Sequence, residues 1–187
     1  MKLKNTYFLL RHGRNIHQTK LKNICYGWPD DEVPCKLDNV GIEQATLAGE
    51  KLKESEIDLI YASPVLRTKQ TAEIVANMLG INTICFDKGF RDMNWGVFAG
   101  GPKKKVYEYY KNKDLMNEAP EKGESWSMLQ KRVVDVIKSI EASYFNKRVL
   151  IVSHKDPILL LEAFYNNWSF EEILEKDIQV GELRRLN

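Results

Sequence analysis

The stretch that decides the fold is Tyr7-Phe8-Leu9-Leu10-Arg11-His12-Gly13, an apolar run that ends in a basic tripeptide. Because polar alternation is missing, residues 5–10 are predicted to form a strand that is buried on both faces. A second apolar run over 148–153 predicts another such strand, and His154 follows it directly. Ligands of open α/β sheets bind at the carboxyl ends of the strands, so we expect His12 and His154 to meet at one edge.

Helical patterns alternate with these strands along the chain. Two further strands are predicted at 57–62 and 82–86, and an edge strand at 178–186. Helices are predicted at 41–54, 65–79, 103–112, 125–145, 157–166 and 170–176. This order predicts an α/β protein, a three-layer sandwich with a mainly parallel central sheet and helices on both faces. No linker or repeat interrupts it, so residues 1–187 are expected to form a single domain.

Turn-forming residues set several expected boundaries. Pro64 is expected to open the helix at 65–79 within its first turn, and Gly80 is expected to end it. Ser169 and Glu172 have the spacing of a capping box. Residues 14–40 contain Gly27-Trp28-Pro29-Asp30-Asp31 and Pro34, which predicts a loop over the pocket.

Composition excludes several classes of function. The 28 basic and 26 acidic residues leave a net charge of +2, too balanced to indicate a nucleic-acid partner. No apolar stretch approaches the roughly 20 residues of a membrane span, and the N-terminus lacks the apolar region of a signal peptide. Three cysteines without metal-type spacing are expected to be reduced thiols, which predicts a cytoplasmic protein.

Two histidines and two arginines, Arg11 and Arg67, are therefore expected at one sheet edge. A neutral imidazole is a good nucleophile toward a phosphoryl group, and a guanidinium fork can bind two phosphate oxygens at once. A leaving oxygen also needs a proton, for which we choose the carboxyl group of Asp92. These charges predict a phosphate site that needs neither a metal nor a cofactor.

The chain resembles the histidine phosphatase superfamily, in the branch similar to cofactor-dependent phosphoglycerate mutase. The resemblance implies the same three-layer fold, phosphorylation of His12, phosphate binding by Arg11 and Arg67, a second phosphate-site histidine at His154 and an acid at Asp92. The resemblance also implies that Gly27 is a substrate-binding residue. The matching segments, in family order, are Leu10-Arg11-His12-Gly13, Tyr26-Gly27-Trp28, Ala62–Ala72, Phe90-Arg91-Asp92-Met93, Gly123-Glu124-Ser125 and Val152-Ser153-His154.

The sequence departs from the family pattern at three places. Asp92 stands where this branch usually has glutamate, and Lys155 replaces the usual glycine after the second histidine. Arg14-Asn15 replaces a Glu-Thr pair, and Gln18 stands where an asparagine often contacts phosphate. Asn15, Gln18 and Lys155 are therefore candidate substrate-binding residues. The added positive charge predicts a substrate with more than one anionic group.

The chain is thus predicted to be a metal-independent phosphatase that hydrolyses a phosphate monoester of a small metabolite through a phosphohistidine. A phosphoglycerate-type mutase and a non-catalytic binder of phosphorylated ligands stay open as alternatives. Asp156 is a second candidate for the acid. An insert at about 93–124 is expected to select the substrate, which the sequence does not identify. The oligomeric state is also left open, a dimer included.

The remaining polar and aromatic residues have competing interpretations. His17 is expected to be a loop residue and not a metal ligand. The run Lys103-Lys104-Lys105 is either a solvated helix start or a contact for an acidic substrate. Trp126 is assigned to the core, whereas Trp28 and Trp95 are expected to wall the pocket. Glu124 is either a helix N-terminal charge or a residue of the pocket rim.

Overall fold

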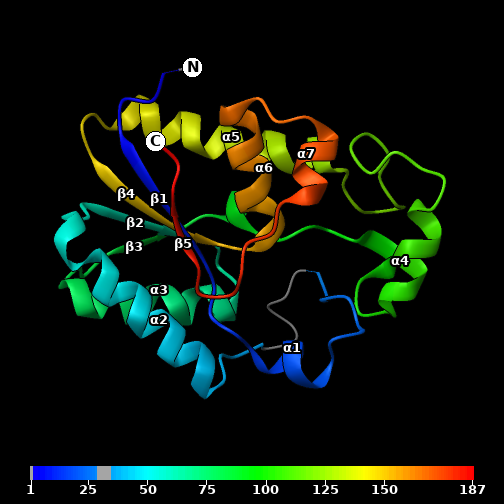
Figure 1. Ribbon diagram of the computed structural model, residues 1–187, viewed down its shortest axis with the longest axis horizontal. Coiled ribbons are helices and arrows are strands. Elements are labelled where there is room, and N and C mark those ends of the chain that lie inside the picture. The colour runs from blue at the N-terminus through cyan, green and yellow to red at the C-terminus, as the bar shows by residue number, and fades with distance from the viewer. Residues whose placement is uncertain (1, 29–34) are drawn as a thin grey trace.

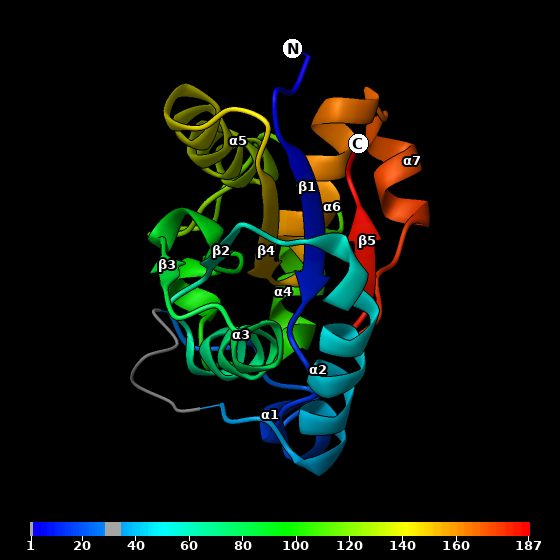
Figure 2. The same cartoon turned by 90° about the vertical axis from the view of Figure 1, so that its left-hand side faces the viewer.

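The centre of the fold is a five-stranded sheet in the computed structural model, which describes residues 2–28 and 35–187 (Figure 1). The strands lie in the order β3-β2-β4-β1-β5 (Figure 2). The first four are parallel to one another, and β5 pairs antiparallel with β1. The prediction of a mainly parallel sheet with an added edge strand is confirmed. The strands are β1 Thr6–Arg11, β2 Leu59–Ala62, β3 Ile84–Phe86, β4 Arg148–Ser153 and β5 Leu183–Arg185.

Helices cover both faces of the sheet, as the sequence predicts. Helices α2 and α3 pack together on one face, and α5 and α6 pack together on the other (Figure 1). The three layers follow from this arrangement. The helices are α1 Ile16–Lys20, α2 Asn39–Leu52, α3 Leu66–Leu79, α4 Lys103–Tyr110, α5 Trp126–Ser143, α6 Lys155–Asn166 and α7 Phe170–Glu175.

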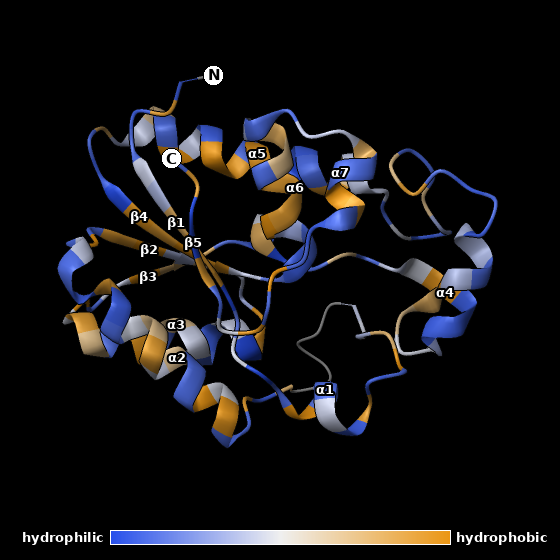
Figure 3. Ribbon diagram, in the orientation of Figure 1, coloured by the Kyte–Doolittle hydropathy of each residue, from blue (hydrophilic) through white to orange (hydrophobic). Residues whose placement is uncertain are grey.

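The core lies in two layers, because successive side chains of a strand point to opposite faces. In β1, Tyr7 and Leu9 join the cluster under α5 and α6, whereas Leu10 joins the cluster with α2 and α3. In β4, Val149 and Val152 divide between the two clusters in the same way. Figure 3 shows the resulting apolar character of the central strands. Both faces bury apolar side chains, which explains the unbroken apolar runs in the sequence.

The interpretation of 14–40 as a loop was wrong in two places. Helix α1 lies within it, and α2 begins before its end. The side chains of Asn15 and Gln18 cap the first turn of α1 reciprocally, which satisfies backbone N–H groups at its start. The turn signals at Pro29-Asp30-Asp31 and Pro34 lie outside the described residues.

Proline, glycine and a capping box mark the ends of α3 and α7. The sequence predicted that Pro64 would lie in the first turn of α3, and that prediction was wrong. Helix α3 begins at Leu66, and Val65 is its N-cap, so Pro64 precedes the helix. Gly80 ends α3 with φ of 69°, a left-handed conformation that glycine adopts without strain. The capping box of Ser169 and Glu172 at the start of α7 is confirmed.

The carboxyl ends of β1, β2 and β4 lie side by side. Arg11 is opposite Ser153 in the register of β1 and β4, and Ala62 is opposite Val152 in that of β2 and β4. The residue that follows each strand therefore reaches the same edge of the sheet. Within the described part of the chain, no helix has the length and apolarity to cross a membrane.

Candidate active site

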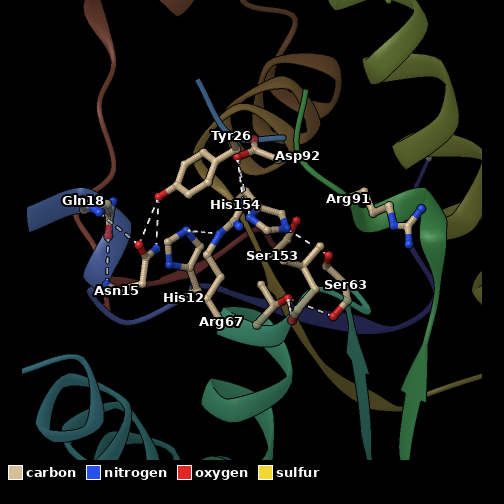
Figure 4. Close-up of polar contacts among 12 residues, drawn as sticks. His12, Asn15, Gln18, Tyr26, Ser63, Arg67, Arg91, Asp92, Ser153 and His154 are labelled. Atoms are coloured by element: carbon tan, nitrogen blue, oxygen red, sulfur yellow. Dashed lines mark hydrogen bonds and ion pairs between the residues drawn. The ribbon is translucent and has the colours of Figure 1, made fainter. Parts of the chain in front are cut away.

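His12 lies at the end of β1 and is almost completely buried. Its Nδ1 lies 2.8 Å from the carbonyl oxygen of Gly13, an acceptor, so Nδ1 carries the proton and Nε2 has a free lone pair. The Nε of Arg67 donates to that Nε2 at 3.2 Å (Figure 4). Burial first, and then the charges of Arg67 and Arg11, lower the pKa of His12 well below its usual range. The ring is therefore a neutral base with its lone pair toward the arginine.

A close backbone contact holds this imidazole in place. A Cβ on Gly13 would lie 2.3 Å from the carbonyl oxygen of Gly41 in α2, so only glycine fits there. The backbone N–H of Gly13 donates to Oγ1 of Thr71, and that hydroxyl donates to the carbonyl oxygen of Arg67. The nucleophilic candidate and the first turn of α3 are thus tied together.

His154 lies at the end of β4, and its ring meets that of His12 edge-on with 5.3 Å between centroids. Its Nε2 is 2.9 Å from Oγ of Ser63 (Figure 4). Its buried Nδ1 has no hydrogen-bond partner among the described residues and lies 3.7 Å from a carboxylate oxygen of Asp92. Burial and the neighbouring Arg67 lower the pKa of His154. When Ser63 donates to Nε2, Nδ1–H is available to an anionic oxygen.

Two guanidinium groups supply permanent positive charge beside the histidines. Arg67 lies in the first turn of α3 and is fully buried. Its guanidinium carbon is 4.0 Å from the centre of the Tyr26 ring. Its Nη2 is 3.2 Å from Oδ2 of Asp92. Arg11 donates from Nη1 to the carbonyl oxygen of Ile178, while its buried Nε has no hydrogen-bond partner in the described part of the chain. Both groups can therefore stabilise a phosphate at His12.

The loop that carries Asp92 is held by an ion pair that the sequence does not reveal. Arg132 of α5 donates to Glu124 at 2.6 Å, and Glu124 is nearly buried. Glu124 is thus neither a free helix charge nor a rim residue, as the sequence suggested, but the partner of Arg132. The arginine also binds three carbonyl oxygens of the loop, each at 2.8 Å: those of Gly89, Arg91 and Asp92.

Most of the other candidate binding residues have partners of their own. Asn15 is fully buried and donates to the hydroxyl of Tyr26, and Gln18 completes the cap of α1 (Figure 4). Gly27 is half-buried, and its neighbour Tyr26 makes the contact with Arg67. Lys155 forms an ion pair with Asp177 at 2.7 Å. Tyr26, although part of a quoted motif, was not predicted as a site residue.

Several aromatic and titratable groups surround the site. Trp95 and Trp126 line a cavity together with Asp156, and Trp28 lies under the guanidinium of Arg91. Burial first, and then the charge of Asp92, raise the pKa of Asp156 to about 7. His17 belongs to α1, not to a loop, and its ring is stacked on that of Tyr26.

A phosphate ester at this edge would meet a neutral nucleophile, two fixed cations and two carboxyl groups. The imidazole Nε2 can attack phosphorus, the guanidinium groups can stabilise the charge on the transferring oxygens, and a carboxyl group can donate a proton. The arrangement has the parts that transfer of a phosphoryl group to histidine requires.

Known proteins are similar to this chain over most of its length. The chain is 31% identical over 146 residues to the uncharacterized phosphatase PhoE of Bacillus subtilis (strain 168), covering 78% of this chain and 69% of that protein. It is 26% identical over 207 residues to the 2,3-bisphosphoglycerate-dependent phosphoglycerate mutase of Methanococcus vannielii (strain ATCC 35089 / DSM 1224 / JCM 13029 / OCM 148 / SB), covering 92% and 86%.

A solved structure shares the fold. YhfR of Bacillus stearothermophilus superposes with a TM-score of 0.83 at 23% identity, covering 97% of this chain and 90% of that one. Residues 7–187 also match the histidine phosphatase superfamily (branch 1). Since that match spans nearly the whole sequence, the chain belongs to branch 1 of the histidine phosphatase superfamily.

Proposed function

We propose that this protein is a phosphatase that hydrolyses the phosphate monoester of a small metabolite through a phosphohistidine at His12. One observation carries the proposal. His12 is neutral, its Nδ1 proton is held by a backbone carbonyl, and its Nε2 lone pair faces Arg67. A histidine that only packed at a strand end would not need a buried arginine on its lone pair.

The first step forms a bond between Nε2 of His12 and phosphorus and breaks the ester P–O bond. Arg11 and Arg67 stabilise the charge on the transferring oxygens, and Nδ1–H of His154 donates to one of them. A carboxyl group, Asp92 in this proposal, gives its proton to the leaving oxygen, so an alcohol departs. The phosphate brings negative charge next to the carboxyl groups, which favours the protonated, donating form of the acid.

The second step returns the protein to its starting state. Water attacks phosphorus, the carboxylate of Asp92 accepts a proton from that water, and the N–P bond breaks. Inorganic phosphate leaves, and Nε2 regains its lone pair. The permanent charges of the arginines take the place that Mg²⁺ has in many phosphoryl-transfer sites, so no metal or cofactor enters this scheme.

The test is hydrolysis of p-nitrophenyl phosphate by wild type and His12→Ala, with EDTA present throughout. Wild type is expected to turn over, and His12→Ala is expected to lose at least about a thousandfold in kcat. Wild type quenched in alkaline denaturant is expected to contain a phosphohistidine that is stable to base and labile to acid. If both proteins gave only the same background hydrolysis, a non-catalytic binder of phosphorylated ligands would be favoured. Loss of all turnover in EDTA would overturn the metal-free scheme.

A mutase is the second candidate, because one similar relative is a bisphosphoglycerate-dependent phosphoglycerate mutase. Mutases need a closed site that keeps the phosphohistidine away from water. Only about 30 residues separate Asp92 and Ser125 here, which favours hydrolysis. Addition of a bisphosphate primer to a phosphoglycerate distinguishes the two, because a mutase yields the isomer and a phosphatase yields inorganic phosphate.

A further inference from the structure

A cavity of about 410 Å³ lies between α4, α6 and α7, and no step proposed above uses it. This volume is within the usual range for clefts that bind small molecules. Residues of α4 line one side, and residues of α6 and α7 line the other. Figure 1 shows α4 and α7 on the same side of the molecule.

The cavity adjoins the phosphate site through Tyr26. Tyr26 lines it, and the ring of Tyr26 lies 4.0 Å from the guanidinium carbon of Arg67. Asp156, two residues after His154, lines it as well. An ester whose phosphate binds at His12 can therefore extend its alcohol portion toward this cavity.

The walls are mainly apolar and aromatic. Val106 and Tyr107 come from α4, Leu159 from α6, and the rings of Trp95 and Trp126 complete the lining. Side chains of this kind bind a planar or branched apolar group by burial and ring contact. A small, fully hydroxylated alcohol would leave most of this surface without a contact.

The charges at the rim are mostly positive. Lys103, Lys155 and Lys176 line the cavity, but Lys155 is paired with Asp177 at 2.7 Å. Lys103 forms no ion pair with any described residue, although its half-buried position brings its charge near His17 and Cys25. A ligand anion is the partner that Lys103 lacks.

We propose that this cavity binds the alcohol portion of the substrate, and that it selects phosphate monoesters of ring-sized apolar alcohols that carry a second anionic group. Lys103 pairs with that second anion. This inference rests on the proposed function. It also moves the expected role of the added positive charge from Lys155 to Lys103, since Lys155 already has a carboxylate partner.

The experiment compares kcat/KM for four esters. Phenyl phosphate has the ring alone, and 4-carboxyphenyl phosphate adds a carboxylate. Tyramine O-phosphate adds an ammonium instead, and 3-phosphoglycerate has a carboxylate without a ring. Wild type is expected to prefer the carboxyphenyl ester over the phenyl ester by about tenfold, the effect of one charge-assisted hydrogen bond. The ammonium ester and the ring-free ester are expected to be poorer than the carboxyphenyl ester.

A matched pair of variants assigns the preference. In Lys103→Gln the ratio of carboxyphenyl to phenyl ester is expected to fall toward one. Lys105→Gln, on the same helix but exposed and outside the cavity lining, is expected to keep both the ratio and the activity of wild type. Circular dichroism checks that each variant is folded.

The outcomes separate the two proposals. If wild type hydrolyses the esters through His12 but shows no preference for the carboxyphenyl ester, or if Lys103→Gln keeps that preference, the cavity inference is wrong and the phosphatase proposal stands. If no ester is hydrolysed and His12 is never phosphorylated, the proposed function itself fails. A preference for the ammonium ester would also overturn the inference.

Discussion

The side chain of Arg67 donates to the lone pair of His12 across 3.2 Å. A permanently charged group therefore donates to the electron pair that, in the proposed mechanism, attacks phosphorus. The same guanidinium also reaches Asp92, 3.2 Å from its Nη2. In the proposed mechanism the phosphate takes over this arginine, and that exchange frees both the Nε2 of His12 and the carboxyl group of Asp92.

Arg67→Lys is expected to lower kcat/KM for p-nitrophenyl phosphate by a factor of about 100 to 1000, the loss that follows removal of one preorganised charged donor. Lysine keeps the charge but lacks the planar fork that reaches both His12 and Asp92. Steady-state kinetics measure the loss. Near-native kcat/KM in a folded Arg67→Lys variant would show that charge alone, without the fork, is sufficient.

The protonation of His12 gives a second test. Burial and the cations Arg67 and Arg11 lower its pKa, because each disfavours the charged imidazolium. In Arg11→Gln one cation is gone, so the pKa of His12 is expected to rise and the ring to become protonated at a higher pH than in wild type. The Cε1–H chemical shift, followed by NMR across pH 4–8 without substrate, measures this directly. An unchanged or lower pKa in Arg11→Gln would contradict the electrostatic explanation.

Arg132 is expected to act through Asp92, because it holds the backbone of the loop that carries this carboxyl group. Arg132→Gln should slow hydrolysis of an alkyl phosphate by about tenfold or more, since a poor leaving group depends on the proton from Asp92. Hydrolysis of 2,4-dinitrophenyl phosphate should change much less, because that leaving group needs little protonation.

The control for this prediction is Lys131→Gln. Lys131 is exposed and paired with Asp135, so both substrates should be hydrolysed at the wild-type rate. Equal losses on the alkyl and dinitrophenyl esters in Arg132→Gln would indicate general damage to the site and not a displaced acid.

The sequence predicts those parts of the site that depend on a single strand or helix. It does not predict contacts that form only when several elements come together. The apolar runs place His12 and His154 at strand ends, and the alternation of strands with helices predicts a parallel sheet in which those ends share one edge. Arg132 escaped prediction, since its partner Glu124 and the loop at 89–92 meet it only in the folded chain.

Short polar segments were harder to interpret. The pair Asn15 and Gln18 has the spacing of a cap, but the resemblance to the family indicated these residues only as candidate substrate-binding residues. The cap was missed because a helix of five residues has almost no hydrophobic periodicity. Likewise, nothing near Lys155 in the sequence indicates Asp177, which lies beyond two helices.

The carboxyl group of Asp156 predicts a pH-dependent stability. Its pKa is raised to about 7 when folded, above the value near 3.9 of an unfolded chain. A folded chain that holds the proton more tightly is stabilised below the unfolded pKa, and that stabilisation is lost as pH rises through 7. Asp156→Asn, which has no proton to lose, should therefore gain stability relative to wild type by about 1–2 kcal/mol between pH 5.5 and 7.5.

Urea unfolding of both proteins at the two pH values measures this difference, and other titrating groups cancel in the comparison. A difference that stays constant with pH would mean that Asp156 is ionised throughout. It would also remove Asp156 as the alternative proton donor at neutral pH.

The contact of Gly13 with Gly41 predicts how the chain tolerates a methyl group. In Gly13→Ala the new Cβ would lie 2.3 Å from a backbone carbonyl oxygen that cannot turn away. We expect a loss of about 3 kcal/mol in the free energy of unfolding, together with loss of activity, because His12 is the adjacent residue.

Gly80→Ala is the matched control, since its Cβ would meet no atom within 4 Å. Only the strain of its positive φ remains, about 1 kcal/mol, and activity should be retained because Gly80 ends α3 far along the chain from the site residues at its start. If both variants lost the same stability and kept the same activity, the close approach of Gly13 to Gly41 would not be what holds the imidazole.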